Sequence, residues 1–335
     1  MHSAHPGLPA LQAWAQQHGA GWGQRQPVVV ALSAGADSMA LLHAAAQVWP
    51  RQLEAVHVNH GLQAAAADFE ALAQSACADL HVPLHVECVQ ALPQPGESPE
   101  AAARQSRYAA LAHKAQQLQA AVVLLAHHGQ DQSETVLLAL SRGAGLPGLS
   151  GMAPVFERHG MRFARPWLEV SGVALREWLQ AQAIAYAQDP TNADVHYTRN
   201  RIRHQVLPAW RQAFEAADEM LARSARHAAQ AQSLLQELAA QDLALLGNPP
   251  HIKPLQALSS ARQANVLRYW LARSHHTQAS DAQLQALLQQ VAACTTRGHR
   301  IEIKVGHGQV LREGATLVFV PLVTPSVKDA KAADL

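Results

Sequence analysis

Short apolar runs rich in β-branched residues alternate with amphipathic segments along the first part of the chain. Such runs are typical of buried strands, and the alanine- and glutamine-rich segments between them have the spacing of helices. The predicted strands cover residues 28–32, 53–59, 83–89 and 121–126. The predicted helices between and after them cover residues 38–48, 63–80, 99–118 and 131–142. This alternation predicts an α/β fold, with a Rossmann-like parallel sheet covered by helices on both faces.

The pattern changes after an extended segment at residues 161–170 and a predicted helix at 172–182. Residues 211–246 are predicted to be helical throughout. Candidate positions on the apolar face of this helix are Phe214, Met220, Leu221, Leu234, Leu235 and Leu238. Two further helical stretches lead to a β-like end, in which glycines at 306–308 and 314 predict turns between strands.

A chain of 335 residues has room for roughly two domains by the usual length prior. We predict an N-terminal α/β domain, a smaller C-terminal domain of helices plus a few strands, and a disordered tail, over residues 1–212, 213–323 and 324–335. Hydrophobic residues make up 49% of the chain and charged residues 15%, which fits a globular protein and argues against a disordered one.

Composition also limits location and partners. No apolar stretch is long enough to cross a bilayer, and the first residues lack a signal pattern, so we expect a cytoplasmic protein without a membrane partner. The three cysteines are far apart and form no C-x-x-C pair, which argues against a disulfide framework or a zinc knuckle. Because the net charge is only +1, a nucleic-acid partner would have to bind local basic patches.

The stretch "LSAGADS" at residues 32–38 has the layout of a phosphate-binding turn between a strand and a helix. Gly35 allows a tight turn, successive N–H groups and the helix N-terminus would face an anion, and Ser33 and Ser38 add hydroxyl groups. Asp37 suits a Mg²⁺ ion that bridges phosphate oxygens. The turn has no lysine, so it is not a Walker motif. The alternative is an ordinary strand-to-helix turn with Asp37 or Ser38 as N-cap.

A second polar cluster, "AHHGQDQSET" at residues 126–135, also follows a predicted strand and opens a helix. Asp131 and Glu134 share a helical face. They are candidates for metal binding or proton transfer, or they are helix-start carboxylates favoured by the dipole. His127 and His128 should point to opposite sides, and without a third ligand they do not predict a zinc site.

Two further segments carry clustered charge. In "DPTNADVHYTRNRIRHQVLP", the arginines at 199, 201 and 203 predict phosphate or RNA contacts, or a solvated basic face beside the domain junction. In "EAAARQSRY", the side chains of Glu100, Arg104 and Tyr108 share a helical face, which also fits simple bracing of the helix. A second basic patch in the C-terminal part consists of Arg297, Arg300 and Lys304.

Taken together and in this order, these segments resemble the tRNA(Ile)-lysidine synthases, which are PP-loop ATP pyrophosphatases. "VHVNHGLQ" at residues 56–63 is similar to the family's second-strand signature, and the arginine-rich segment ending at Pro208 matches its most specific motif. The resemblance covers residues 27–210. Two positions depart from the family pattern, because Ala34 replaces the first glycine of the turn and Gln130 replaces the first acid of an Asp-Asp pair.

The resemblance implies that ATP is cleaved between its α- and β-phosphates to adenylate the wobble cytidine of the tRNA(Ile) with a CAU anticodon, after which free L-lysine displaces AMP. It implies ATP contacts from Ser33, Ala34, Gly35, Ala36, Asp37 and Ser38. Asp37 and Asp131 become candidates for catalysis and for Mg²⁺ binding. Candidate substrate or tRNA contacts are His60, Arg104, Tyr108, His127, Glu134, Arg199, Asn200 and Arg203.

Several alternatives stay open from the sequence. The chain could be another PP-loop tRNA-modifying enzyme, such as a thiolase, although its scattered cysteines argue against that chemistry. It could also be a non-catalytic nucleotide- or tRNA-binding module, given Ala34 and Gln130. A homodimer is one open assembly state. We expect Gly35 to be the more demanding backbone position of the turn, and Ala34 to be tolerated where its φ is negative.

Overall fold

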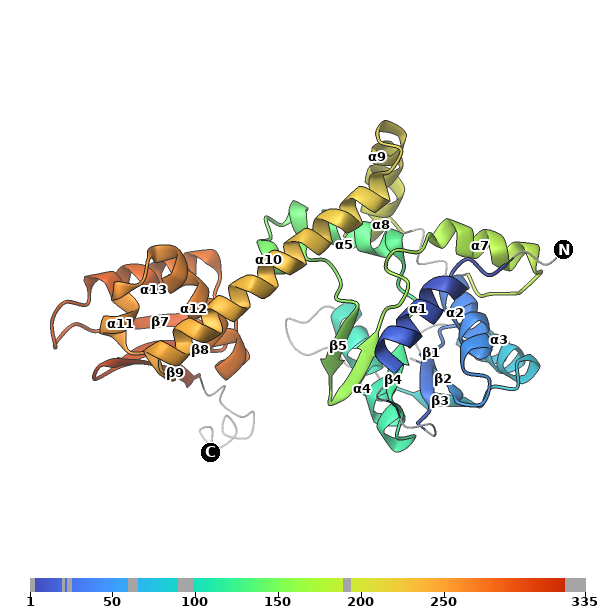
Figure 1. Ribbon diagram of the computed structural model, residues 1–335, viewed down its shortest axis with the longest axis horizontal. Coiled ribbons are helices and arrows are strands. Elements are labelled where there is room, and N and C mark those ends of the chain that lie inside the picture. The colour runs from blue at the N-terminus through green and yellow to red at the C-terminus, as the bar shows by residue number, and fades with distance from the viewer. Residues whose placement is uncertain are drawn as a thin grey trace, which may run out of the picture. The chain divides into compact units, whose positions relative to one another are not determined.

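The computed structural model describes residues 4–19, 22, 26–59, 66–89, 99–188 and 194–322. The chain divides into two compact units, Met1–Ala229 and Gln230–Leu335 (Figure 1). The first unit contains a six-stranded sheet and the second a three-stranded sheet. This arrangement confirms the predicted α/β fold class with a C-terminal part of helices and strands.

The larger sheet has the strand order β3-β2-β1-β4-β6-β5. Its strands are β1 (Val28–Ala31), β2 (Leu53–Asn59), β3 (Leu84–Cys88), β4 (Val122–Leu124), β5 (Val155–Arg158) and β6 (Met161–Ala164). All neighbours pair in parallel except β5 and β6, which form an antiparallel hairpin at one edge. The chain order reverses at β1, which lies between β2 and β4. In sheets of this kind, ligands bind beyond the carboxyl ends of the strands at that point.

Helices cover both faces of the sheet, as predicted. One face is covered by α1 (Leu8–His18), α2 (Ala36–Val48), α3 (Ala66–Asp79) and α7 (Gly172–Ala181), and the other by α4 (Pro99–Gln117). Between β4 and β5 the chain also forms α5 (Gly129–Ser141) and the short α6 (Leu146–Leu149). Successive residues of a strand face opposite sides. Val28 and Val30 therefore belong to the core under α1, α2, α3 and α7, whereas Val29 belongs to the core under α4.

The end of the first unit departs from the predicted continuous helix. It consists of α8 (Thr198–Arg201), a π-helical turn η3 (Ile202–Val206), α9 (Leu207–Ala213) and α10 (Ala217–Leu246). Ile202 and Leu207 pack with Leu221 of α10 against the apolar side of α5. The chain leaves the helical conformation at Phe214, where φ is −137°. This break separates α9 from the long helix α10.

The prediction that Phe214, Met220 and Leu234 lie on a buried apolar face is wrong, because all three are exposed. In the first unit α10 buries Leu221 and Ala225. In the second unit the buried positions of the same helix are Ala239, Leu243 and Leu246. Because α10 packs against different elements in the two units, different faces of the helix are buried, and a single apolar stripe does not describe the whole helix.

The second unit packs three helices and a meander around Trp270 and its apolar neighbours. The elements after α10 are α11 (Ile252–Ala257), α12 (Ser260–His275), α13 (Asp281–Ala293), β7 (Glu302–Val305), β8 (Gly308–Glu313) and β9 (Thr316–Pro321). Gly306 and Gly314 have φ values of 55° and 60° and make the two hairpin turns, as predicted. Among the described residues, no helix is both long and apolar enough to cross a lipid bilayer.

Candidate active site

The turn after β1 is closed by the side chain of Ser38. Its Oγ accepts a hydrogen bond from Ser33 N at 3.2 Å and donates one to the Gly35 carbonyl at 2.9 Å. Gly35 occupies the N-cap position of α2, and no side chain caps the helix. The prediction of Asp37 or Ser38 as N-cap is therefore wrong. The first-turn N–H groups of α2 are left for an external acceptor, which is the arrangement that binds phosphate at helix N-termini.

Ala34 is the strained residue of this turn. Its φ is +61°, in the left-handed region, whereas Gly35 has φ −72° and ψ 162°, which any residue adopts. The expectation that Gly35 is the more demanding backbone position is therefore wrong. The position that requires a positive φ, and so favours glycine, is the one where this chain has Ala34. The left-handed conformation costs a non-glycine residue about 1–2 kcal/mol. A hydrogen bond of 2.8 Å from Ala187 N to the Ala34 carbonyl holds the turn in this conformation.

Asp37, in the first turn of α2, faces the start of α5. Its Oδ1 lies 3.4 Å from His128 Nε2 and 3.7 Å from Arg176 Nη1. This oxygen is buried and makes no hydrogen bond among the described residues. A buried carboxylate oxygen without a hydrogen bond is suited to a cation or a proton that arrives with substrate.

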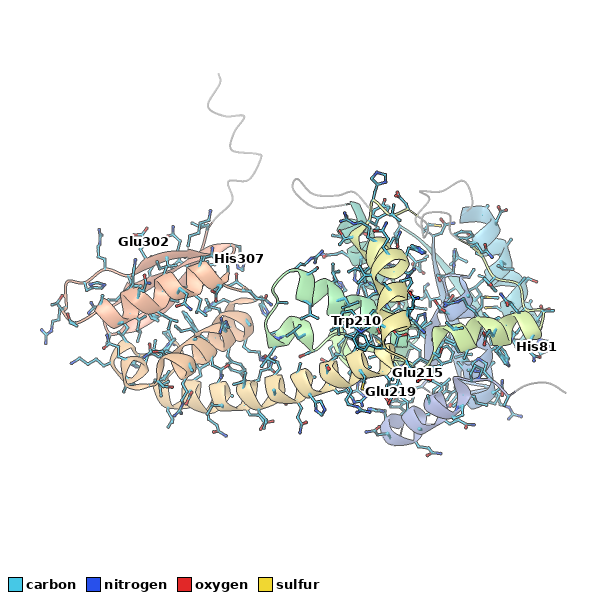
Figure 2. The ribbon with its side chains drawn as sticks, turned by 90° about the horizontal axis from the view of Figure 1, so that it is seen from above. His81, Trp210, Glu215, Glu219, Glu302 and His307 are labelled. Carbon is cyan, nitrogen blue, oxygen red and sulfur yellow. The ribbon has the colours of Figure 1, made fainter. Side chains whose placement is uncertain are left out.

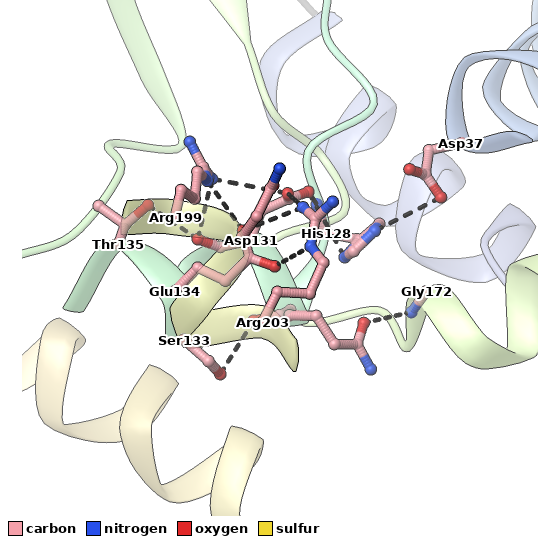
Figure 3. Close-up of polar contacts among 12 residues, drawn as sticks. Asp37, His128, Asp131, Ser133, Glu134, Thr135, Gly172, Arg199 and Arg203 are labelled. Atoms are coloured by element: carbon pink, nitrogen blue, oxygen red, sulfur yellow. Dashed lines mark hydrogen bonds and ion pairs between the residues drawn. The ribbon is translucent and has the colours of Figure 1, made fainter. Parts of the chain in front are cut away.

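His128 lies between Asp37 and Asp131 (Figure 3). Its Nδ1 is 3.5 Å from Asp131 Oδ2, and its backbone N–H donates to the same oxygen at 3.0 Å. Burial alone would lower the pKa of His128, but the contact with Asp37 and the charge of Asp131 outweigh it and raise the pKa above its ordinary value. The raised pKa favours the protonated form of His128, whose ring lies between the two carboxylates. Burial would raise the pKa of Asp131, yet His128 and the other nearby cations lower it.

Glu134, one turn further along α5, is almost fully buried with 1% of its side chain exposed. Arg199 Nε donates to its Oε2 at 2.8 Å, and Arg203 donates from Nε to Oε1 at 2.6 Å. Both guanidinium groups also lie within 3.7 Å of Asp131 Oδ1. Burial would lower the pKa of Arg203, but its hydrogen bonds to Glu134 raise it. The structure thus brings the arginine-rich segment onto the second polar cluster.

His127 points away from His128, as predicted, toward a group of arginines. Arg165 Nε donates to His127 Nδ1 at 3.3 Å, and both Arg165 and Arg104 donate to the Tyr108 hydroxyl at 3.4 Å. Burial, followed by the charge of Arg165 and its neighbours, lowers the pKa of His127 to about 3. His127 is therefore a neutral hydrogen-bond acceptor.

The sequence analysis missed two residues of this region. His128 was set aside with His127, although its place immediately before a helix that opens with acidic residues was a usable signal. Arg165 directly follows β6 and is buried, with hydrogen bonds to Ala153, His127 and Tyr108. A lone arginine after an extended segment carries no signal in the sequence that it is buried.

Asn200 donates to the Asp194 carbonyl at 2.8 Å and so holds its own loop. Arg297, Arg300 and Lys304 are exposed on the second unit. His60 lies outside the described residues. In the part of the chain that the structure describes, no group of three His, Cys, Asp or Glu side chains is arranged for a metal ion.

The departure at Gln130 has a structural explanation. Its side-chain oxygen accepts a hydrogen bond of 2.6 Å from Gly172 N, the first residue of α7. An added Cβ at Gly172 would lie 2.6 Å from His128 Nε2 and 2.8 Å from the Gln130 oxygen, so α7 approaches this site closely. Gln130 thus tethers α7 to the start of α5, and the cluster keeps its acid at Asp131.

Comparisons with known proteins agree with this geometry. Residues 10–210 match the family model of the PP-loop domain, and residues 251–317 match that of the TilS substrate binding domain. The fold of the first unit is also similar to a solved U34-tRNA thiolase, NcsA from Methanococcus maripaludis. That similarity has a TM-score of 0.54 at 12% identity and covers 68% of this chain and 83% of the other.

Closer relatives are found among curated proteins. A protein named tRNA(Ile)-lysidine synthase from Polaromonas naphthalenivorans is 59% identical over 88% of this chain and 89% of its own length. A protein of the same name from Bordetella pertussis is 41% identical over 85% of this chain and 92% of its own length. With both family models matched in order and identity at this level, the chain belongs to the tRNA(Ile)-lysidine synthase family.

Proposed function

We propose that this protein attaches free L-lysine to carbon 2 of the wobble cytidine in the tRNA(Ile) with a CAU anticodon, using ATP and releasing AMP and pyrophosphate. One observation carries the proposal beyond family membership. A single edge of the sheet gathers an uncapped phosphate-type turn, the unbonded oxygen of Asp37, and the His128–Asp131 contact. These are the parts that adenylation followed by amine attack requires.

In the first step the cytidine O2 attacks the α-phosphorus of ATP, an O–P bond forms and pyrophosphate leaves. The first N–H groups of α2 and the hydroxyl of Ser33 are positioned to hold the negative charge of the leaving group. The carboxylates of Asp37 and Asp131 fit Mg²⁺, which prefers one or two carboxylates plus phosphate oxygens. When bound, that ion would neutralise phosphate charge.

In the second step the ε-amine of lysine attacks carbon 2 and the C–O bond to AMP breaks. Lysine enters as an ammonium ion, so a carboxylate must take its proton. Asp131 is a poor acceptor because His128 N–H binds its Oδ2 and two arginines lie near its Oδ1. We assign the proton to Asp37, because 36% of its side chain is exposed against 14% for Asp131, so the lysine amine reaches it more readily.

The tRNA would be held by exposed basic residues. Arg201 lies in the first unit, and Arg297, Arg300 and Lys304 lie in the second, which matches a substrate binding domain. We infer that Arg199 and Arg203 act mainly through Glu134 and Asp131, because their guanidinium groups are already paired.

The alternatives lose support. A degenerate module was suggested by Ala34 and Gln130, yet the turn is formed with Ala34 in place, and Gln130 has a partner of its own. A thiolase would need a set of reactive cysteines, whereas Cys88 is the single exposed one of the three; Cys77 and Cys294 are buried, and burial raises the pKa of Cys77 to about 11. A thiolate is therefore disfavoured at that position.

The proposal is tested by ATP–pyrophosphate exchange with and without the CAU-anticodon tRNA. We expect exchange that depends on the tRNA, because the cytidine oxygen is the group that displaces pyrophosphate. Exchange that is absent with the cognate tRNA would support the non-catalytic alternative.

A further inference from the structure

Exposed aromatic side chains are concentrated in one segment of the protein. The chain has 5 Phe, 7 Trp and 4 Tyr. Among the described residues, the exposed ones are Tyr197, Trp210 and Phe214, with 48%, 37% and 59% of their surface accessible. All three lie in residues 197–214, from the N-cap of α8 to the C-cap of α9, and this segment also carries Arg199 and Arg203.

Two of these rings form a continuous exposed stripe with a third apolar residue. Val206 ends η3, Trp210 lies in α9 four residues later, and Phe214 is the residue that follows α9, where the backbone becomes extended. The ring centroids of Trp210 and Phe214 are 5.9 Å apart, with the ring planes inclined by 50°. Ile202 and Leu207 of the same segment are buried against α5. We call Val206, Trp210 and Phe214 the aromatic stripe.

The residues that precede the stripe in the chain are basic, and those that follow it are acidic. On the side of the active site, Arg199, Arg201 and Arg203 precede it. After the stripe, Glu215 precedes α10, and the first turn of α10 carries Asp218 and Glu219. Trp210, Glu215 and Glu219 are labelled in Figure 2. Asp218 is paired with Arg211 at 2.8 Å, and Glu219 with Arg223 at 3.3 Å. The stripe itself is thus nearly neutral, which favours contact with bases over contact with phosphates.

We propose that the aromatic stripe stacks unpaired bases of the tRNA anticodon loop beside the wobble cytidine, a proposal that rests on the proposed function. For its ring to react, the wobble cytidine must leave its neighbours and enter the site, which deprives those neighbours of a stacking partner. Exposed Trp and Phe rings supply one, and they tolerate any base because every base has a π-face.

The distances along the segment fit this role. Trp210 follows Arg203 by seven residues, which is about 10 Å along a helix. A stacked strand advances about 3.4 Å per nucleotide. A base on Trp210 would therefore be within roughly three nucleotides of a base held near the Glu134–Arg203 pair. An anticodon loop supplies unpaired bases over such a span.

The test measures binding of two synthetic RNA hairpins to the full chain over a range of salt concentrations. One carries the anticodon stem and loop, and in the other the nucleotides flanking the wobble cytidine are abasic. We expect Trp210→Ala to weaken binding of the intact hairpin by about 10-fold without changing the salt slope. Trp210→Phe should restore most of the affinity, and the abasic hairpin should bind wild type and Trp210→Ala equally.

Two control variants separate stacking from other effects. Arg201→Ala should lower the salt slope by about one unit, and Leu140→Ala, which removes an exposed apolar side chain elsewhere on the first unit, should change neither affinity nor slope. In lysidine formation, Trp210→Ala should raise the KM for tRNA and leave kcat unchanged. If wild type forms no lysidine, the proposed function fails, while the hairpin comparison still tests the stripe.

Equal affinity of wild type and Trp210→Ala for the intact hairpin would overturn the proposal. It would also be overturned by a wild-type dimer that Trp210→Ala converts to a monomer with unchanged hairpin affinity. In that case the stripe is an interface between copies of the chain.

Discussion

Arg203 binds Glu134 through two hydrogen bonds, from Nε to Oε1 at 2.6 Å and from Nη2 to Oε2 at 3.0 Å. The carboxylate is almost fully buried, and Arg199 supplies a third hydrogen bond to it. This geometry joins α5, which carries Asp131, to η3, and so ties the active site to the segment that bears the aromatic stripe.

Removal of the Glu134 charge should destabilise the first unit. Glu134→Gln leaves two guanidinium groups facing a neutral amide, and breaking a buried pair typically costs about 3–5 kcal/mol. Because both arginines are about one-third exposed, we expect the lower end, roughly 3 kcal/mol in the free energy of unfolding. Urea denaturation measures it. The matched control, Glu219→Gln in the exposed pair with Arg223, should cost under about 1 kcal/mol.

The backbone of the phosphate turn predicts an unusual order of tolerance. Gly35→Ala should change the free energy of unfolding by less than about 1 kcal/mol, because Gly35 has a φ that any residue adopts and an added Cβ meets only Ser33 Oγ at 3.5 Å. Ala34→Val should cost more than about 2 kcal/mol, since a β-branched side chain enters a buried left-handed position. The reverse order in thermal or chemical denaturation would show that the turn has a different conformation.

His5 should make stability depend on pH. Gly7 N–H donates to its Nδ1 at 3.0 Å, so the neutral ring keeps its proton on Nε2, which lies 3.0 Å from the Ala40 carbonyl. Burial lowers the pKa of His5 below 6.5. The unfolded chain then binds the proton more readily, so this contribution is present above about pH 6.5 and is lost as the pH falls, by up to about 1.4 kcal/mol per unit.

The corresponding measurement compares wild type with His5→Gln, which keeps a donor and an acceptor but does not titrate. Unfolding free energies measured between pH 7.5 and pH 5 should fall more steeply for wild type. Parallel profiles would show that His5 titrates alike in the folded and unfolded chains.

At the start of α5, Asp131 should carry the negative charge that the reaction needs, and Gln130 should not need to be an acid. Asp131→Asn removes the charge that faces His128, Arg199 and Arg203, and we expect single-turnover lysidine formation to slow by about a hundredfold or more. Gln130→Asp shortens the side chain that reaches Gly172 N. It should cost about 1 kcal/mol of stability and change the rate much less. A wild type that is inactive until Gln130→Asp restores it would favour a degenerate enzyme.

The elements that the sequence predicted well are those with a strong local pattern. The strands β1, β2, β3 and β4 appear within two residues of their predicted ends because each is a short apolar run, and β1 and β4 in the middle of the sheet are buried almost throughout. The edge strand β5 was missed, since a half-buried strand that turns at Gly160 into its antiparallel partner has little periodicity of its own. Helix α1 was also missed.

The features of the candidate site also fall into those that a local sequence pattern indicates and those that depend on distant contacts. The positions of Ser33, Asp37, Asp131 and Glu134 after predicted strands already indicated that they lie at the edge of the sheet where ligands bind, and their role in a site stays a prediction. The role of Arg165 and the φ of Ala34 depend on contacts with residues distant in the sequence, which no local pattern records. The exposure of Trp210 and Phe214 likewise follows from the break after α9, which composition alone did not reveal.

The central claim, that this protein joins ATP chemistry to the wobble cytidine before lysine enters, has one direct test. The CAU-anticodon tRNA is incubated with the protein and ATP labelled at the α-phosphate, first without lysine and then with it, and Asp37→Asn is run alongside. We predict that label becomes attached to the tRNA without lysine and leaves as AMP when lysine is added, with lysidine formed at the wobble position and little of either step in Asp37→Asn. Wild-type protein that binds the tRNA and ATP but never transfers label to the RNA would contradict the account.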